Sequence, residues 1–355
     1  MSITWSWRLL RAGSFRLDGG GMFGVVPKVL WSKMVDPDDR NRIPLQTNCL
    51  LLEGPVRGES RQPSASSQQP TARSHQRPAE GSPAAPDRQP TTVHRQPIRV
   101  LIETGFGDKW SDKDRDIFAI ERRTVVDALA EVGVTPEQID LVIVSHLHFD
   151  HAAGLTQVGE GTGHQALGNG KSGASGTGVS GAGVSSAIVP TFPNARIVVQ
   201  RREWEDALDN RSTMTKTYLR DHLDPIADRV ILVDGETEID DRIPGIPRGV
   251  GGITVWPLPG HTWGQQGIRF HDAGGVVAFV GDVIPTINHV GLAFSIGYDM
   301  EPWTNMQTKR ALLDRACREG WRLALDHEPG PHPVVRVAAH PDRKGQWVLE
   351  AAASP

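Results

Sequence analysis

The feature that most constrains this chain is a short apolar run that leads directly into a cluster of histidines. Residues Leu141 to Val144 are continuously apolar and bounded by polar residues, which is the pattern of a strand covered on both faces. In the next seven residues, His146 and His148 project to the same side of an extended segment, and the following turn can bring Asp150 and His151 to an adjacent point. Four residues of the types that bind metal ions therefore leave one strand end. The alternative is that they are ordinary hydrogen-bonded histidines.

The rest of the chain alternates strand-like and helix-like segments, which predicts a mixed α/β architecture in layers. The expected strands are 45–53, 98–103, 195–200, 230–233, 253–257, 266–270, 276–280 and 322–325. Helical segments are expected at 124–132, 135–138 and 202–208, and from Thr304, which forms a capping box with Gln307, to Gly320.

Two segments differ from the rest in composition. Residues 55–97 hold 8 of the 26 prolines and no aromatic residue, so they are expected to form a disordered loop. Residues 158–188 hold 10 of the 38 glycines among small polar residues, as flexible linkers do. The remainder is near the upper size for one hydrophobic core. The sequence therefore predicts a single domain over residues 1–355, with low-complexity inserts at 55–97 and 158–188.

Charge and cysteine content narrow the partners and the compartment. The formal charge of −4 lacks the basic excess of nucleic-acid-binding proteins, and no run of 18 apolar residues predicts a membrane span. A small-molecule partner is therefore expected, without nucleic acid or membrane, and the oligomeric state is left open. Cys49 and Cys317 both lie in apolar stretches, which favours a reducing cytoplasm.

Further candidate metal ligands follow three predicted strands downstream. They occur in Pro259-Gly260-His261-Thr262, Val280-Gly281-Asp282 and Leu325-Asp326-His327, each just beyond a strand. A metal site built from the first cluster requires additional ligands of this kind.

HLHFDH followed by GHT, GD and a late strand-end His resembles the metallo-β-lactamase superfamily of binuclear hydrolases. Within it, the runs GGGMFGVVP at 19–27 and GDVIPT at 281–286 are most similar to the branch of N-acyl-homoserine lactonases and methyl parathion hydrolase. The resemblance implies an α/β fold, a four-layer αβ/βα sandwich of the metallo-β-lactamase type. It also implies metals at one edge, between the two sheets.

The resemblance also implies a ligand set and a reaction. His146, His148 and His261 would hold one divalent metal, Asp150, His151 and His327 the second, and Asp282 would bridge them. Zinc is expected, with iron or manganese as alternatives. A hydroxide shared by the two metals would attack a small ester, lactone or phosphotriester.

Three side chains are candidates for supporting roles. Asp150 is expected to accept a proton during attack or to pass one to the leaving group. Tyr298 falls where similar lactonases place a tyrosine at the substrate carbonyl, and its alternative is a packed tyrosine with a satisfied hydroxyl. Glu103 stands where the family usually has Asp, and it either orients a ligand histidine or is a plain strand-end charge.

Two other functions stay open. One is a thioester hydrolase like glyoxalase II, which shares the ligands, although the segment after His327 is short for the basic glutathione-binding region of that family. The other is a non-catalytic, metal-stabilised interaction protein. The remaining histidines are expected to be non-ligands, with His289 the one closest to the pocket rim; they are His75, His94, His164, His222, His271, His289, His332 and His340.

Overall fold

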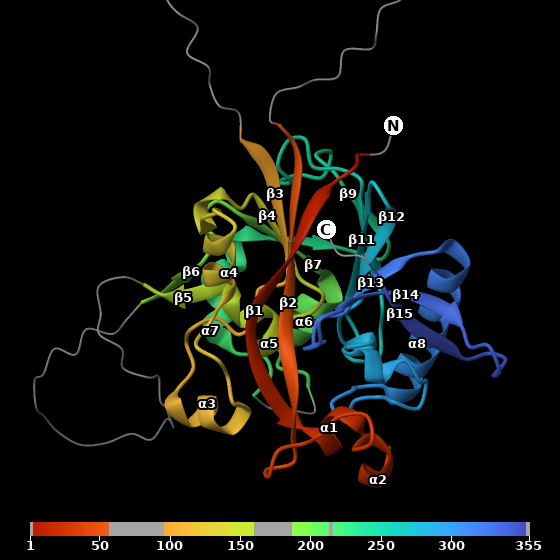
Figure 1. The fold of residues 1–355 in the computed structure, drawn as a ribbon. Coiled ribbons are helices and arrows are strands. Elements are labelled where there is room, and N and C mark those ends of the chain that lie inside the picture. The colour runs from red at the N-terminus through yellow and green to blue at the C-terminus, as the bar shows by residue number, and fades with distance from the viewer. Residues whose placement is uncertain (1–2, 57–95, 160–186, 213–215, 353–355) are drawn as a thin grey trace, which may run out of the picture.

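A computed structural model describes residues 3–56, 96–159, 187–212 and 216–352, and its main body consists of two β-sheets that pack face to face with helices outside (Figure 1). The first sheet has the order β1-β2-β3-β4-β7-β8. Its strands are β1 (Ser6–Asp18), β2 (Arg42–Val56), β3 (Pro97–Ile102), β4 (Leu141–Ile143), β7 (Arg196–Gln200) and β8 (Val230–Val233).

The second sheet has the order β15-β14-β13-β12-β11-β10-β9 and is antiparallel except where β12 pairs with β13. Its strands are β9 (Thr237–Ile239), β10 (Ile253–Pro257), β11 (Gln266–Asp272), β12 (Gly275–Phe279), β13 (Arg322–Ala324), β14 (Val334–Ala339) and β15 (Trp347–Ala351). A small separate pair consists of β5 (Thr156–Val158) and β6 (Ile188–Pro190).

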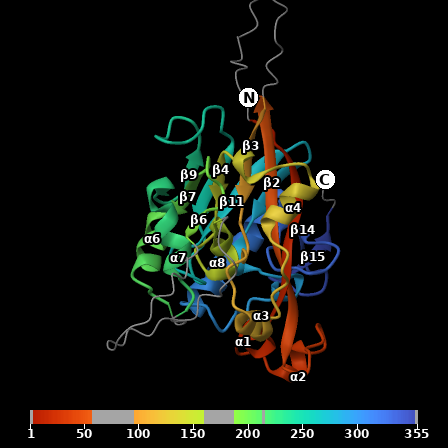
Figure 2. The ribbon, with the colours of Figure 1, turned by 90° about the vertical axis from the view of Figure 1, so that its left-hand side faces the viewer.

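Helices cover the outer face of each sheet (Figures 1 and 2), with α4 and α7 beyond the first sheet and α8 beyond the second. The α-helices are α1 (Gly19–Phe23), α2 (Lys28–Trp31), α3 (Asp112–Phe118), α4 (Val125–Glu131), α5 (Phe149–Ala152), α6 (Arg201–Leu208), α7 (Arg220–Leu223) and α8 (Pro302–Glu319). Short 3₁₀ turns occur at Pro136–Gln138, Ala153–Leu155, Asp224–Arg229, Gly281–Val283 and Ile287–His289. None of the helices in the described ranges is long and apolar enough to cross a membrane.

The alternation of side chains along the strands accounts for the layers. In β2, Leu50 and Leu52 enter the core between the two sheets, whereas Cys49 and Leu51 enter the core under the helices of the first sheet. Successive side chains of a strand point to opposite faces, so a strand buried on both sides is apolar throughout. The four-layer αβ/βα sandwich expected from the sequence is confirmed.

The predicted strands and helices occur within a few residues of their expected bounds, with one wrong cap. The last helix was expected to begin at Thr304 with a capping box, but α8 begins at Pro302 with Glu301 as its N-cap residue. Proline is favoured at the first helical position because it has no N–H to leave unsatisfied there, so the helix begins before Thr304.

The outermost residues of both inserts belong to strands rather than to loops. Val56 pairs with Pro97, and Val158 pairs with Ile188, so the chain leaves and returns at adjacent strand positions. The predicted disorder concerns residues that lie outside the described ranges. The assignment of the whole chain to a single domain stays a prediction.

The fold brings several strand ends to one edge of the sandwich. The first sheet contributes the segment after β4, and the second contributes the loops that follow β10, β12 and β13. These are the four places where the sequence puts candidate metal ligands, so residues more than 100 positions apart meet there.

Candidate metal centre

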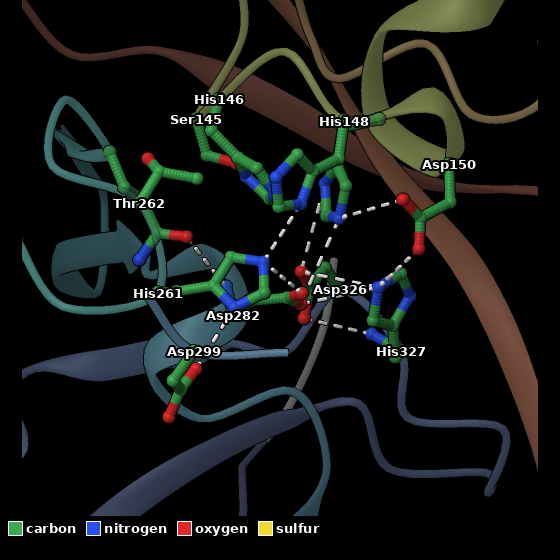
Figure 3. Close-up of polar contacts among 12 residues, drawn as sticks. Ser145, His146, His148, Asp150, His261, Thr262, Asp282, Asp299, Asp326 and His327 are labelled. Carbon is green, nitrogen blue, oxygen red and sulfur yellow. Dashed lines mark hydrogen bonds and ion pairs between the residues drawn. The ribbon is translucent and has the colours of Figure 1, made fainter. Parts of the chain in front are cut away.

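The candidate ligands form two groups at this edge (Figure 3). One group consists of three histidines, His146, His148 and His261, and we call it the three-histidine group. The other consists of His151, Asp282, Asp326 and His327, and we call it the carboxylate-rich group. Within each group the potential ligand atoms lie within 4.8 Å of one another, and all seven residues are buried. This spacing is what a metal ion bound by several side chains requires.

Asp282 joins the two groups. Its Oδ2 lies 3.0 Å from His261 Nε2, while its Oδ1 lies 3.2 Å from His327 Nε2 and 3.8 Å from His151 Nε2. One carboxylate therefore faces both groups with separate oxygens. This is the position expected of a bridging ligand.

Asp150 lies beside the carboxylate-rich group. Its Oδ2 is 3.5 Å from His327 Nε2, and its Oδ1 is 3.8 Å from His151 Nε2. The one-turn helix α5, which begins at Phe149, places Asp150 and His151 close to the strand end that carries His146 and His148. The structure thus brings all seven residues predicted as ligands to one place.

Asp326 is a member of the carboxylate-rich group that the sequence reasoning did not select. Its Oδ2 lies 3.8 Å from His327 Nε2 and 3.9 Å from His151 Nδ1. Burial, together with the nearby Asp282 carboxylate, raises the pKa of Asp326 to about 8. The available signal was an acidic residue directly before a strand-end histidine, but that pattern alone does not separate a ligand from a neighbour.

Four of the five histidines are held by a hydrogen bond or ion pair at Nδ1, which leaves Nε2 for the site. Such partners fix the tautomer and orientation of an imidazole that binds a metal. The pairs are His146 with Ser145 Oγ at 3.0 Å, His151 with Glu103 Oε2 at 3.2 Å, His261 with Asp299 Oδ1 at 3.0 Å, and His327 with the Gln46 carbonyl at 3.0 Å. His148 is turned the other way, with Nδ1 3.0 Å from His261 Nε2.

Several buried polar atoms of the two groups have no hydrogen-bond partner among the described residues. They are Nε2 of His146, His148, His151 and His327, Oδ1 of Asp282 and Oδ2 of Asp326. A buried polar atom without a partner costs free energy, and native proteins rarely leave several together. Imidazole nitrogens and carboxylate oxygens in this number suit one or two divalent ions, so these residues fit a metal centre.

The charge environments of the histidines differ between the groups. Burial and the neighbouring histidines keep the pKa values of His146 and His148 well below their usual range, so both are neutral. For His151, burial is outweighed by Asp150 and Glu103, which raise its pKa to about 9. The carboxylates around His151 thus favour a positive charge at this group.

Glu103 takes the orienting role that was one of its two predicted alternatives. It is buried, and besides the contact with His151 its Oε1 accepts a hydrogen bond from Ser145 N at 2.5 Å. Its backbone has φ +67°, a left-handed conformation that is uncommon for a residue other than glycine. Glu103 thereby connects the end of β3 to the histidine segment after β4.

The family is identified by a direct match. Residues 99–327 match the model of the metallo-beta-lactamase superfamily, and this stretch includes every candidate ligand. The chain belongs to the metallo-beta-lactamase superfamily. The resemblance expected from the sequence motifs is therefore confirmed.

Curated relatives of this superfamily member include N-acyl homoserine lactonases. The chain is 28% identical over 148 residues to the N-acyl homoserine lactonase AiiA of Bacillus thuringiensis subsp. kurstaki, and an N-acyl homoserine lactonase of Bacillus sp. matches over the same length. The match covers 42% of this chain and 39% of the relative, well under half of the lactonase.

Solved structures share the fold over nearly the whole chain. A probable metal-dependent hydrolase from Staphylococcus aureus has a TM-score of 0.67 at 24% identity, covering 100% of both chains. AidC, a dizinc quorum-quenching lactonase solved with a product, has a TM-score of 0.62 at 14% identity, covering 99% of both. The hydrolase class expected from the sequence agrees with the names of these relatives.

An open hollow, with about 60 Å³ of space for water-sized molecules, lies over the candidate metal centre of this metallo-beta-lactamase superfamily protein. Its described lining contains no Lys or Arg, and its walls are largely apolar. The lining residues are Leu17, Met22, Phe118, His148, Phe149, Asp150, Ser212, Thr217, His261, Asp282, Tyr298 and His327. Met22 and Phe149 belong to this wall, whereas Phe23 and Trp31 stack on each other in the core.

Tyr298 lies in the wall of the same hollow as Asp150 and Asp282. It is half-buried, and burial, with the charges of Asp18 and Asp150, raises the pKa of its phenol above the usual range. A protonated phenol can donate a hydrogen bond to an oxygen that becomes negative. Tyr298 therefore lies where a contact with the substrate carbonyl would require it.

The histidines expected to be non-ligands lie outside both groups where the structure describes them. His289, expected to be the nearest to the rim, is fully buried: Nδ1 contacts Thr286 Oγ1 at 2.8 Å, Nε2 contacts the Met22 carbonyl at 2.8 Å, and the ring stacks on Phe23. His289 is thus a satisfied core residue. His75, His94 and His164 lie outside the described residues.

Proposed function

We propose that this chain is a binuclear metal-dependent hydrolase that acts on a small ester, lactone or phosphotriester. One observation carries the proposal. Two groups of buried ligand-type side chains face each other, and the Asp282 carboxylate directs one oxygen to each. The names of the relatives, which include metal-dependent hydrolases and lactonases, support the same activity.

We assign the candidate ligands to two ions according to their contacts. His146, His148 and His261 would hold one ion, and His151 and His327, with Asp150 and Asp326 beside them, would hold the second. Asp282 would contact both. When bound, two divalent ions lower the pKa of water towards about 7 and polarise the carbonyl or phosphoryl oxygen of a substrate. Zinc is our first proposal, because AidC is described as dizinc, with iron or manganese as alternatives.

The residues of the chain supply orientation and proton transfer. Asp150 lines the hollow and is within 4 Å of two histidine nitrogens, so its carboxylate is placed to accept a proton during attack and to return it to the leaving group. Tyr298, on the wall of the hollow, is placed to donate its hydroxyl proton in a hydrogen bond to the substrate oxygen. The apolar wall excludes water from the reacting groups and binds uncharged substituents.

Two alternatives use the same centre. A thioester hydrolase like glyoxalase II would take a larger, acidic substrate, and the absence of Lys and Arg from the described lining of the hollow disfavours it. A non-catalytic, metal-stabilised protein would have a metal centre closed to solvent, whereas this centre opens into the hollow. Whichever of these functions holds, we propose that the protein is cytoplasmic, since Cys49 and Cys317 are both free.

A substrate panel with controlled metal loading tests the proposal. Protein freed of metal and reloaded with zinc, manganese or iron is assayed on a lactone, an aryl ester, a thioester and a phosphotriester. We expect two ions per chain and turnover of an uncharged lactone, ester or phosphotriester. Preference for the thioester would favour the first alternative, and two bound ions without turnover of any of the four would favour the second.

A further inference from the structure

One buried carboxylate outside both groups lies against the two loops that carry the three-histidine group. Glu203 is the third residue of α6, and its side chain is 0% exposed. Because α6 follows β7, and β7 pairs in parallel with β4, the start of α6 lies beside the strand end that leads to His146. No Lys or Arg is among the described hydrogen-bond partners of Glu203.

Both oxygens of Glu203 accept hydrogen bonds from residues adjacent to the histidines. Oε1 accepts from Leu147 N at 2.9 Å, in the peptide between the first two histidines of the group. Oε2 accepts from Thr262 Oγ1 at 2.6 Å, and Thr262 directly follows the third histidine. Oε1 also accepts from the Tyr218 hydroxyl at 3.1 Å, and the Tyr218 ring lies 5.1 Å from the His148 ring. One side chain thus connects the surroundings of all three histidines.

The backbone is shaped to permit this contact. A Cβ atom at Gly264 would lie 2.2 Å from Glu203 N and 2.5 Å from its Cα. Only glycine lets the loop after His261 approach the start of α6 so closely. The contact therefore depends on Glu203 in α6 and on Gly264 in the loop.

The charge of Glu203 needs compensation. Burial raises its pKa, and the three hydrogen bonds and the nearby His261 offset part of that effect. A buried carboxylate without a cationic partner is costly in free energy. A divalent ion among the three imidazoles would be the nearest full compensating charge.

We propose that Glu203 is the positioning residue of the three-histidine group, which holds both histidine loops and supplies a negative charge that favours a cation there. The inference rests on the metal centre proposed above. It concerns one ion only, because the described contacts of Glu203 do not reach the carboxylate-rich group.

The test measures the affinity of each ion separately by Co²⁺ titration of metal-free protein, with the visible absorption of bound Co²⁺ as the readout. His146→Ala and His327→Ala give reference spectra for protein lacking one or the other site. Glu203→Gln removes the charge but keeps the hydrogen bonds, since the Thr262 hydroxyl can also accept, and we expect a loss of about 10-fold at the three-histidine group. Glu203→Ala removes both, and the expected loss is about 100-fold. The second ion should change by less than about 3-fold.

Asp206→Asn is the matched control. Asp206 is a buried carboxylate on the same helix, but its ion pairs among the described residues are with Arg202 and Arg211, and none of them involves a histidine loop. This variant should lower the unfolding midpoint without changing either Co²⁺ affinity. If Glu203→Ala does not fold, Glu203→Gln and Thr262→Val, which removes a single hydrogen bond, carry the test.

The outcomes separate the two proposals. Wild-type protein that binds two ions, with both Glu203 variants unchanged at the three-histidine group or weakened equally at both groups, would overturn the role of Glu203 alone. Wild-type protein that binds fewer than two ions would overturn the binuclear centre, and this inference with it.

Discussion

The two halves of the metal centre are built from similar atoms in different electrostatic surroundings. In the three-histidine group, burial and mutual proximity keep His146 and His148 neutral. In the carboxylate-rich group, Asp150 and Glu103 raise the pKa of His151 to about 9, and Asp326, with Asp282, raises that of His327 well above its usual range. The third histidine of the first group, His261, differs from its neighbours, because Asp282 and Asp299 outweigh its burial and raise its pKa. The second group therefore attracts a cation more strongly by charge, whereas the first depends more on how well its imidazoles are held.

Substitution of Asp282, the residue that both groups share, should have the largest effect. Asp282→Ala removes the one carboxylate that faces both groups, so we expect both ions to weaken and turnover to fall by more than about 100-fold, beyond what loss of an outer partner costs. Metal content by elemental analysis and turnover on the best substrate measure this. Loss of only one ion, with the other unchanged, would show that Asp282 belongs to a single group.

The outer partners give a smaller and more selective effect. In Glu103→Gln the new amide N–H faces His151 Nδ1, which places the imidazole proton on Nε2, where a ligand lone pair is needed. We expect the ion of the carboxylate-rich group to weaken by about 10- to 100-fold, with the other ion unchanged.

Asp299→Asn is the counterpart in the other group, since Asp299 Oδ1 holds His261 Nδ1 and its Oδ2 accepts from Asn305 Nδ2 at 2.7 Å. The same amide argument predicts that only the three-histidine ion weakens. Stepwise Co²⁺ titration distinguishes the two variants, and identical titrations would contradict the division of the centre into two groups.

The sequence predicts the ligands of both groups better than it predicts their supports. His146, His148 and His151 stand at offsets that a strand and a turn bring together, so short-range geometry is sufficient. Glu203 has no such signal: Arg201-Arg202-Glu203 resembles the start of a solvated helix. Its burial depends on the loop after His261, which is 58 residues away in sequence.

The same limit applies to the fold. The strands β4 and β12 are recognisable from continuous apolar runs, but β1 is not, because its register shifts between Arg11 and Ser14 and the alternation of its side chains is broken there. Gly13 has φ +125° at that shift, and a Cβ atom would lie 2.5 Å from the Arg123 carbonyl oxygen. Such a bulge depends on a neighbour that the local sequence does not reveal.

Substitution of Tyr298 should reduce turnover moderately. Tyr298 lies on the side of the carboxylate-rich group, since Asp150 is among the charges that raise the pKa of its phenol. Tyr298→Phe removes one hydrogen bond to the substrate oxygen, for which we expect a fall in kcat of about 10-fold, with metal content unchanged. Steady-state kinetics on the preferred substrate measure it. Unchanged turnover would assign Tyr298 to packing alone.

The smallest expected effect is on the stability of the metal-free protein, where His146 and His148 of one group and His151 of the other should respond to pH in opposite directions. The folded-state pKa values of His146 and His148 lie well below 6.5, so the unfolded chain takes up protons first and stability is lost as the pH falls through 6.5. The folded-state pKa of His151 is about 9, so its contribution is complete below 6.5 and is lost as the pH rises through 9. Urea unfolding of metal-free wild type, His146→Gln and His151→Gln from pH 5 to 10 measures the two contributions, because titrations of groups distant from the metal centre cancel in the differences. His146→Gln should reduce the acid slope, and His151→Gln should reduce the alkaline slope. If both variants change the same slope, the two groups do not differ in charge in the way that their surroundings indicate.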